Sequence, residues 1–234
     1  MAQGQIFVSD NYLQPLAEHG CVGPENGWTP LAAAAPLYLK NHSWGEFVFD
    51  FAWANAYAQQ GLNYYPKLVS CVPFTPVTGP RLMDCEPQQL EQLAQEHHCS
   101  SAHVLFCLPD EAERLSAQGW LQREDIRFVW RNAGYQGFND FLSQLTLKKR
   151  KNIKRERRRV EEAGVNIRWC VAADISESQW PRLFELYAST YAMRGQAPYL
   201  NLACFKDWAL RLGPAMRFCI AEHEGLLIAV ALFF

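Results

Sequence analysis

A run of positive charge in the second half of the chain places the strongest constraint on the fold. From Lys148 to Arg159, nine of the twelve residues are Lys or Arg and only Glu156 is acidic, so the segment carries a charge of +8. The whole chain has a net charge of −2, which leaves −10 on the other residues. Apolar residues at helical spacing from Phe138 onward, with Gly164 as a stop signal, predict one long helix. Its cationic half must lie in water or against an anion, because unpaired buried charge is costly. We therefore expect a helix that links two modules.

The first module, residues 1–137, shows helix and strand patterns that alternate along the chain. Apolar runs rich in β-branched residues predict strands, and amphipathic segments bounded by capping residues, Gly or Pro predict helices. This mixture is typical of an α/β or α+β fold. The predicted helices cover residues 11–19, 50–61, 87–98 and 110–119, and the predicted strands cover residues 36–40, 46–50, 64–74, 102–108 and 120–130.

The second module, residues 165–234, follows the linking helix of residues 138–164. Its pattern predicts a strand, two helices and a hairpin that turns at Glu224-Gly225. The last apolar strand has no turn residue after it, and an exposed apolar edge is unfavourable, so we expect this module to be the first half of a longer domain. The predicted strands are residues 165–171, 216–223 and 225–234, and the predicted helices begin near Ser176 or Ser178 and at Asn201.

The bulk composition predicts a globular protein. Hydrophobic residues make up 49% of the 234 positions, which is enough for one large core or two small ones. No run of 18 apolar residues occurs and the amino terminus has no signal-peptide pattern, so we expect no membrane span and a cytoplasmic location. The eight cysteines include no C-x-x-C pair, which favours buried thiols. Adjacent side chains diverge at His97, His98 and Cys99, so we expect no metal site there.

Three segments carry a resemblance to a known family. They are PLYLKNHSWGEFVFD (36–50), YYPKLVSCVPFTPVTGPRL (64–82) and LKKRKNIKRERRR (147–159). In these segments the chain resembles the FemAB-like family of bacterial peptidoglycan biosynthesis or recognition proteins. That family is placed in the acyl-CoA N-acyltransferase (GNAT) superfamily. The resemblance implies tandem GNAT-like domains, the second incomplete here, joined by a basic helix. One departure is the short segment 31–35, where the family pattern leaves room for another strand and turn.

The resemblance also implies an acyl donor, either acyl-CoA or aminoacyl-tRNA. A GNAT domain holds the donor pyrophosphate with backbone N–H groups of a Gly-rich loop. In the corresponding loop of this chain, residues 73–82, three prolines remove donors. We therefore expect the donor site to lie outside this chain, in the missing carboxyl-terminal part of the second domain, and we expect no metal to be involved. The sequence RGQA at 194–197 follows a predicted helix, and we interpret it as a helix terminator. The residues that could instead hold an anionic or polar substrate are Tyr64, Lys67, Thr75, Thr78, Gly79 and Arg81, although the prolines alone would also explain a rigid turn.

Acyl transfer to an amine needs a base and donors for the developing oxyanion. Glu46, Asp50 and His42 are the acid–base candidates, because they cluster beside aromatic residues that exclude water. The alternative is a helix cap for Asp50 and ordinary hydrogen bonding for the other two. Tyr64 supplies either a hydroxyl donor or simple packing.

Two functional hypotheses remain open. The first is an N-acyltransferase that moves an acyl or aminoacyl group to an amine on a small molecule or cell-wall precursor. The second is a non-catalytic GNAT-like module that binds an anionic ligand, such as tRNA or a nucleotide-linked precursor, through the basic helix. A solvated charged face is the alternative for that helix, and the oligomeric state is open. The candidate anion-binding residues are Lys149, Arg150, Lys151, Arg155 and Arg158.

Overall fold

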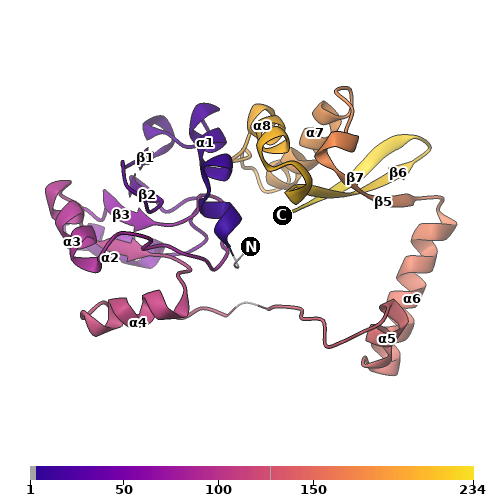
Figure 1. The fold of residues 1–234 in the computed structure, drawn as a ribbon, viewed down its shortest axis with the longest axis horizontal. Coiled ribbons are helices and arrows are strands. Elements are labelled where there is room, and N and C mark those ends of the chain that lie inside the picture. Colours follow the sequence, from indigo (N-terminus) through magenta and orange to yellow (C-terminus); the bar gives the residue numbers. More distant parts are fainter. Residues whose placement is uncertain (1–3, 127) are drawn as a thin grey trace. The chain divides into compact units, whose positions relative to one another are not determined.

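The computed structural model describes residues 4–126 and 128–234, and it divides into two units (Figure 1). Unit 1 is built from the residues up to Gln122 together with Ala188–Gly213. Unit 2 is built from Arg123–Tyr187 together with Pro214–Phe234. Each unit has its own sheet, so the chain is a mixed α+β protein.

The sheet of unit 1 has four strands in the order β1-β2-β3-β4. β1 (Trp28–Pro30), β2 (Leu37–Lys40) and β3 (Lys67–Ser70) are antiparallel, and β4 (Ala102–Val104) is parallel to β3. The parallel pair needs a crossover, which contains α3 (Pro87–Glu96). All four residues of β3 are buried, as its apolar sequence predicts for a central strand. The core between this sheet and its helices consists of Ala35, Leu37, Leu68, Leu82, Leu90, Ala94 and Leu115.

Helices from distant parts of the sequence meet in unit 1. α1 (Asp10–Glu18) packs against α8 (Leu202–Leu212). The Trp208 indole stacks on the Tyr12 ring at 4.6 Å between centroids, and its Nε1–H donates to the Tyr12 carbonyl at 2.8 Å. Both side chains are almost fully buried, so this contact closes a second apolar cluster. The other two helices of unit 1 are α2 (Phe51–Gln59) and α4 (Pro109–Ala117).

Unit 2 contains an antiparallel three-stranded sheet in the order β5-β6-β7. Its inner face packs on α7 through buried Trp180, Leu183 and Phe218. α7 continues into unit 1, because the boundary between the units falls at Tyr187. The elements are α5 (Phe138–Ser143), α6 (Leu147–Glu162), β5 (Asn166–Val171), α7 (Trp180–Ala192), β6 (Arg217–His223) and β7 (Leu226–Phe233).

Short 3₁₀ turns complete the structure at Gln5–Val8, Pro24–Asn26, Ala172–Asp174 and Gly213–Ala215. In the part of the chain that the structure describes, no helix combines the length and the apolar character that a membrane crossing requires.

Two predicted strands and one predicted long helix were wrong. Residues 46–50 form a turn, because Gly45 and Phe47 adopt left-handed backbone angles (φ +81° and +59°) that an extended strand does not contain. Residues 120–126 and 128–130 form no strand, and Arg127 lies outside the described residues. Leu121 and Phe128 are each 97% exposed, and a strand without a paired neighbour is not stable.

The single helix predicted from Phe138 is two helices, α5 and α6. The break follows Gln144, and Thr146 starts α6 as an N-cap whose hydroxyl accepts from the Lys149 N–H. β1 is a strand that the sequence pattern missed, and with it the first sheet has four strands despite the short segment 31–35.

The remaining predicted helices and strands are present, including the hairpin that turns at Glu224-Gly225. The RGQA segment follows α7 as a turn, which confirms its interpretation as a helix terminator. The division at residues 137 and 164 differs from the two units, because α8 belongs to unit 1. The tandem GNAT-like architecture stays a prediction.

Candidate functional site

Four of the predicted site residues meet in a buried charge cluster of unit 1. Lys67 projects from β3, and its Nζ donates to Glu46 Oε2 at 2.8 Å and to Asp50 Oδ2 at 2.5 Å. The Tyr64 hydroxyl donates to the same Asp50 oxygen at 2.7 Å. Lys67 also donates to Ser43 Oγ at 2.9 Å. We refer to these residues, Ser43, Glu46, Asp50, Tyr64 and Lys67, as the Lys67 cluster.

Burial and the shared ammonium affect the two carboxyls differently. Burial raises the pKa of Glu46, and the Lys67 ammonium only partly offsets this effect. Burial alone would also raise the pKa of Asp50, but hydrogen bonds from Lys67, Ser43 and Tyr64 outweigh it and hold that pKa below its usual value. The Asp50 carboxylate is therefore the principal counter-charge of the lysine. Glu46 Oε1 and Asp50 Oδ1 are buried and have no hydrogen-bond partner among the described residues.

The Lys67 cluster is closed to solvent. Glu46 and Asp50 are each 3% exposed and Lys67 is 1% exposed. Asp50 stands at the N-cap position of α2, yet its side chain makes no cap hydrogen bond because it is bound to Lys67 and Tyr64. In this arrangement the cluster holds the turn of residues 43–50 against β3, and a substrate reaches the carboxylates only if that turn moves.

His42 lies outside the Lys67 cluster. Its Nε2 is 2.8 Å from the Asn26 carbonyl, which can only accept, so Nε2 carries the proton. Nδ1 then accepts from the Trp44 N–H at 3.1 Å and from Lys40 Nζ at 3.4 Å. Burial, assisted by the Lys40 charge, lowers the pKa of His42. Both ring nitrogens are therefore engaged in a neutral imidazole.

His42 lines a surface pocket in unit 1 with a volume of about 670 Å³. Its walls come from residues 20–28, from residues 41–44, from Phe74 and from residues 197–201. This volume lies in the range that small-molecule sites occupy. The pocket is lined by Gly20, Cys21, Pro24, Glu25, Asn26, Gly27, Trp28, Asn41, His42, Trp44, Phe74, Ala197, Pro198, Tyr199, Leu200 and Asn201.

Two glycines are required where they pack on pocket side chains. A Cβ on Gly27 (φ +68°) would lie 2.6 Å from the His42 ring, and one on Gly45 (φ +81°) would lie 2.7 Å from the Phe74 ring. Phe74 itself has a φ of +60°, which is strained for a bulky residue. Its N–H donates to the Gly45 carbonyl at 3.0 Å, and its ring stacks on Tyr199 at 4.8 Å. Close packing therefore fixes the aromatic wall of the pocket.

The proline-rich loop, residues 73–82, is braced from inside. Arg81 is fully buried and donates to the carbonyls of Val77, Pro80 and Leu105. Burial lowers the pKa of its guanidinium. Glu111 of α4 accepts from the N–H groups of Arg81, Leu82 and Leu108. Arg81 thus has a structural position in the loop.

Most backbone donors of the loop are also already used within the protein. Prolines occupy three of its positions, and the N–H groups of Phe74, Thr75, Val77, Gly79 and Arg81 donate to other protein groups. The Thr75 hydroxyl pairs with the Tyr12 hydroxyl at 2.7 Å. Only Thr78 retains the character predicted for a substrate contact, at a half-buried position. A pyrophosphate nest does not fit this loop.

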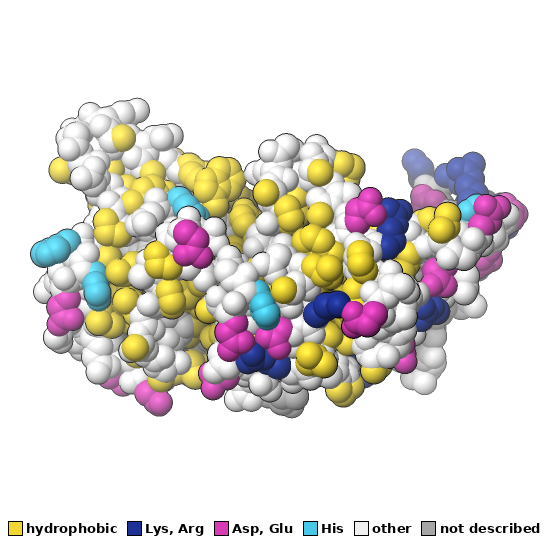
Figure 2. Space-filling model, turned by 90° about the horizontal axis from the view of Figure 1, so that it is seen from above, with side chains coloured by type: hydrophobic (Ala, Val, Ile, Leu, Met, Phe, Trp, Pro, Cys, Tyr) yellow, Lys and Arg dark blue, Asp and Glu magenta, His cyan; other side chains and the backbone are white. Residues whose placement is uncertain are grey.

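The basic helix α6 is exposed. At about 100° per residue, Lys148, Lys151, Arg155, Arg158 and Arg159 fall on one face, which we call the α6 stripe. Figure 2 shows Lys and Arg side chains gathered where α6 lies. Within the described residues, the ion pair recorded for this stripe joins Arg158 to Glu162 at 3.6 Å. Two other predicted anion-binding residues lie off the stripe: Lys149, and Arg150, which donates to the Leu145 carbonyl.

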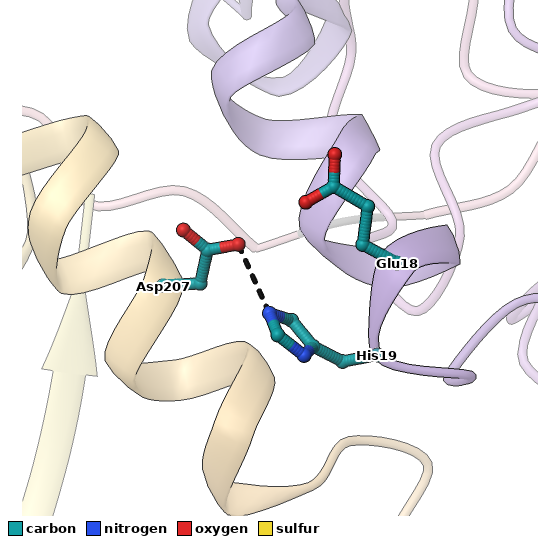
Figure 3. Close-up of side chains that lie close together, drawn as sticks. All are labelled: Glu18, His19 and Asp207. Atoms are coloured by element: carbon teal, nitrogen blue, oxygen red, sulfur yellow. Dashed lines mark hydrogen bonds and ion pairs between the residues drawn. The ribbon is translucent and has the colours of Figure 1, made fainter.

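Glu18, His19 and Asp207 form another group of potential ligands, between α1 and α8 (Figure 3). His19 Nε2 lies 3.0 Å from Asp207 Oδ2. Arg211 donates to Asp207 Oδ1 at 2.8 Å and also to the Glu18 carboxylate. The Arg211 hydrogen bond is the main reason for the lowered pKa of Asp207. Because the Arg211 guanidinium is hydrogen-bonded to both carboxylates, the group is an ion-pair network that joins the two helices.

The sequence did not predict most of the pocket. Trp44 lies next to Gly45, and Glu25 lies next to Pro24. A large aromatic residue in a loop beside a Gly was the one feature of the sequence that could have indicated a binding surface there. Tyr199 and Leu200 gave no signal, because they follow the first wall residues by more than 150 positions and approach them only in the folded chain.

Unit 1 carries a pocket of small-molecule size, and unit 2 carries an exposed cationic helix. The model of the FemAB-like family, described as peptidoglycan biosynthesis/recognition, matches residues 1–234. The chain therefore belongs to the FemAB-like family, which gives it a peptidoglycan-related role. No curated protein matches the chain.

Proposed function

We propose that this chain belongs to an N-acyltransferase that moves an acyl or aminoacyl group to the amine of a cell-wall precursor, and that unit 1 binds the acceptor. The observation that carries the proposal is the family match over the whole chain. The pocket of unit 1 supports it, because it offers a preformed site of suitable size with aromatic walls.

The donor, acyl-CoA or aminoacyl-tRNA, has its site elsewhere in this proposal. The braced loop of residues 73–82 supports this placement, because three of its residues are prolines and the N–H groups of Phe74, Thr75, Val77, Gly79 and Arg81 already donate within the protein. Acceptor binding by unit 1 and donor binding are then separate events, and the reaction requires both.

Acyl transfer requires the acceptor amine to be in its neutral, deprotonated form when it attacks the acyl group. The Lys67 cluster stays a candidate for acid–base work only if the turn of residues 43–50 opens. His42 would have to release its bond to the Asn26 carbonyl or to the Trp44 N–H before it could take a proton. We therefore assign both groups a positioning role in the closed structure.

Transfer is tested with the product of the complete reading frame that contains these residues. Amine-bearing precursor peptides are incubated with acyl-CoA or with aminoacyl-tRNA, and mass spectrometry detects the acylated peptide. We expect acylated peptide with at least one of the two donors. If neither donor gives acylated peptide, the proposal is overturned. The 234-residue chain alone should not bind acyl-CoA tightly, and tight binding would overturn the donor placement.

The α6 stripe favours a second function, the binding of a phosphate-bearing polymer or precursor. Lys148, Lys151, Arg155 and Arg159 are solvent-exposed and form no salt bridge in the described part of the chain. A linear set of cations on one helix face matches the spacing of phosphates along an extended ligand, and its affinity falls steeply with salt.

Fluorescence anisotropy with a labelled tRNA at several salt concentrations tests this function. The triple variant Lys151→Glu/Arg155→Glu/Arg158→Glu should weaken binding and lower the salt slope by about 2–3. The matched control Arg123→Glu/Arg131→Glu/Arg194→Glu changes the same charge at exposed positions outside α6. Equal losses in both variants, or binding that does not depend on salt, would contradict a role for the stripe.

A further inference from the structure

The charges around the unit 1 pocket are one-sided. Among the lining residues, Glu25 carries a formal charge and none is Lys or Arg. Glu25 is exposed, and no ion pair is recorded for it among the described residues. His42 is held neutral by its two hydrogen-bond partners. Glu25 therefore gives the lining residues a net negative formal charge, which favours a cationic ligand over an anionic one.

Aromatic rings form much of the wall. Trp44 is 48% exposed, and Phe74 and Tyr199 are half-buried and stack on each other with an angle of 10° between their planes. Trp28 lies behind them, edge to face with Phe74 at 5.3 Å. The face of an aromatic ring attracts a cation that lies within about 6 Å of its centre.

Nearby on the same aromatic group, an amine nitrogen already occupies such a position. Lys40 Nζ lies 3.3 Å from the centre of the Trp28 ring. Lys40 does not itself line the pocket, but its Nζ donates to His42 Nδ1 and to the Trp44 carbonyl, and both of these residues line the wall. Burial lowers the pKa of Lys40 to about 7, so this amine is only partly charged at neutral pH. The contact shows that this aromatic group has the geometry to accept an amine nitrogen.

The position of the Phe74 ring in the pocket wall is fixed before any ligand binds, and this requires a strained backbone angle. Phe74 is strained at φ +60°, and the absence of a Cβ at Gly45 leaves space for its ring. Strain of this kind persists where the surrounding structure requires one orientation of a side chain. Here it fixes the Phe74 ring against Tyr199 on the pocket wall.

We propose that the unit 1 pocket binds an organic ammonium group, with the nitrogen against the exposed face of Trp44 and with Glu25 as its counter-charge. The alkyl part of the ligand then lies against Pro24, Pro198 and Leu200. This inference rests on the proposed function only in identifying the ammonium with the amine that receives the acyl group. The chemical preference itself follows from the pocket.

The experiment uses the 234-residue chain and three probes that each contain four carbon atoms: n-butylammonium, n-butanol and butyrate. The indole N–H signals of Trp28 and Trp44 in ¹H–¹⁵N NMR spectra report on the pocket, and the spectrum of Trp44→Leu assigns one of them. We expect saturating shifts with n-butylammonium, binding about 10-fold weaker for n-butanol, and none for butyrate. Equal binding of all three probes, or preferential binding of butyrate, would overturn the proposal.

Glu25→Gln removes the counter-charge at an exposed position and should weaken n-butylammonium several-fold without changing n-butanol. The matched control is Glu113→Gln, an exposed position on α4 that does not line the pocket. Trp44→Leu should weaken n-butylammonium by about 10-fold. If Trp44→Leu does not fold, Glu25→Gln decides alone, and an unchanged affinity in that variant would sink the inference.

These probes bind without any acyl donor, so the outcome is separate from the transfer assay. Ammonium binding without acyl transfer by the complete protein would leave the inference standing and count against the proposed function. Acyl transfer without ammonium binding in this pocket would support the proposed function and overturn the inference.

Discussion

The Lys67 cluster and the α6 stripe are two charged regions with opposite solutions to the same physical problem. In the cluster, one ammonium donates to two carboxylates and to the Ser43 hydroxyl, and every member is nearly inaccessible. On the stripe, like charges follow one another along a helix in water. The difference teaches that buried charge in this protein fixes a local conformation, whereas exposed charge stays available to a ligand.

The largest effect is expected from Lys67→Met. It leaves two buried carboxylates without their ammonium, which should lower the free energy of unfolding by about 3–5 kcal/mol. Urea unfolding followed by circular dichroism measures the change. The control is Lys148→Met on the α6 stripe, which should stay within about 0.5 kcal/mol of the unchanged protein. Similar losses in the two variants would remove the distinction between the regions.

Glu111→Ala should have the next largest effect. The carboxylate accepts from three backbone N–H groups, and each buried donor left without a partner costs about 1–3 kcal/mol unless water reaches it. We expect a loss of about 3 kcal/mol in urea unfolding. Glu113→Ala, two positions away on the exposed side of α4, is the matched control. A loss below 1 kcal/mol would show that Glu111 is dispensable for the proline-rich loop.

Lys40 predicts a pH dependence. Burial lowers its pKa from 10.5 to about 7 in the folded protein, so between these values the unfolded chain binds a proton that the folded protein does not. Stability should therefore rise with pH across this window, by at most about 1.4 kcal/mol per pH unit from this group, and the contribution is lost as pH falls toward 7. Urea unfolding at pH 7.5, 8.5 and 9.5 should show a smaller slope for Lys40→Met. An unchanged slope would contradict the shift.

The smallest change in stability is expected from a substitution on the α6 stripe. Arg155 lies four residues from both Lys151 and Arg159, and like charges at this spacing destabilise a helix by about 0.2–0.5 kcal/mol per pair. Arg155→Gln should therefore stabilise α6 slightly, and thermal unfolding monitored at the helix wavelength of circular dichroism tests this. The gain should shrink at high salt. A loss of stability would mean that Arg155 has a folded-state partner.

Local patterns predicted most elements of the fold because they depend on neighbours in sequence. The central strand at Lys67–Ser70 followed from its apolar run, and α3 followed from the Pro at its first turn. A helix was expected to begin near Ser176 or Ser178, and α7 begins at Trp180. The strand predicted for residues 120–130 was wrong, because a strand needs a partner that no local pattern reveals.

The candidate site divides in the same way. The approach of Glu46 and Asp50 was anticipated from their position in one segment, and Lys67 and Tyr64 were already candidates for substrate contacts. Their union in one closed cluster was not anticipated, because it depends on how the turn of residues 43–50 packs on β3. The separation of His42 from this cluster depends on Gly27, whose missing Cβ admits the imidazole.

The sequence alone determined the secondary-structure plan, the basic helix and the family of this chain, because periodicity, capping residues and charge act over short distances along the backbone. Only the tertiary structure decided that α8 packs on α1 and that Tyr199 completes a wall with Phe74. The physical reason is that burial and ring stacking reward contacts between segments whose separation in sequence carries no local signal.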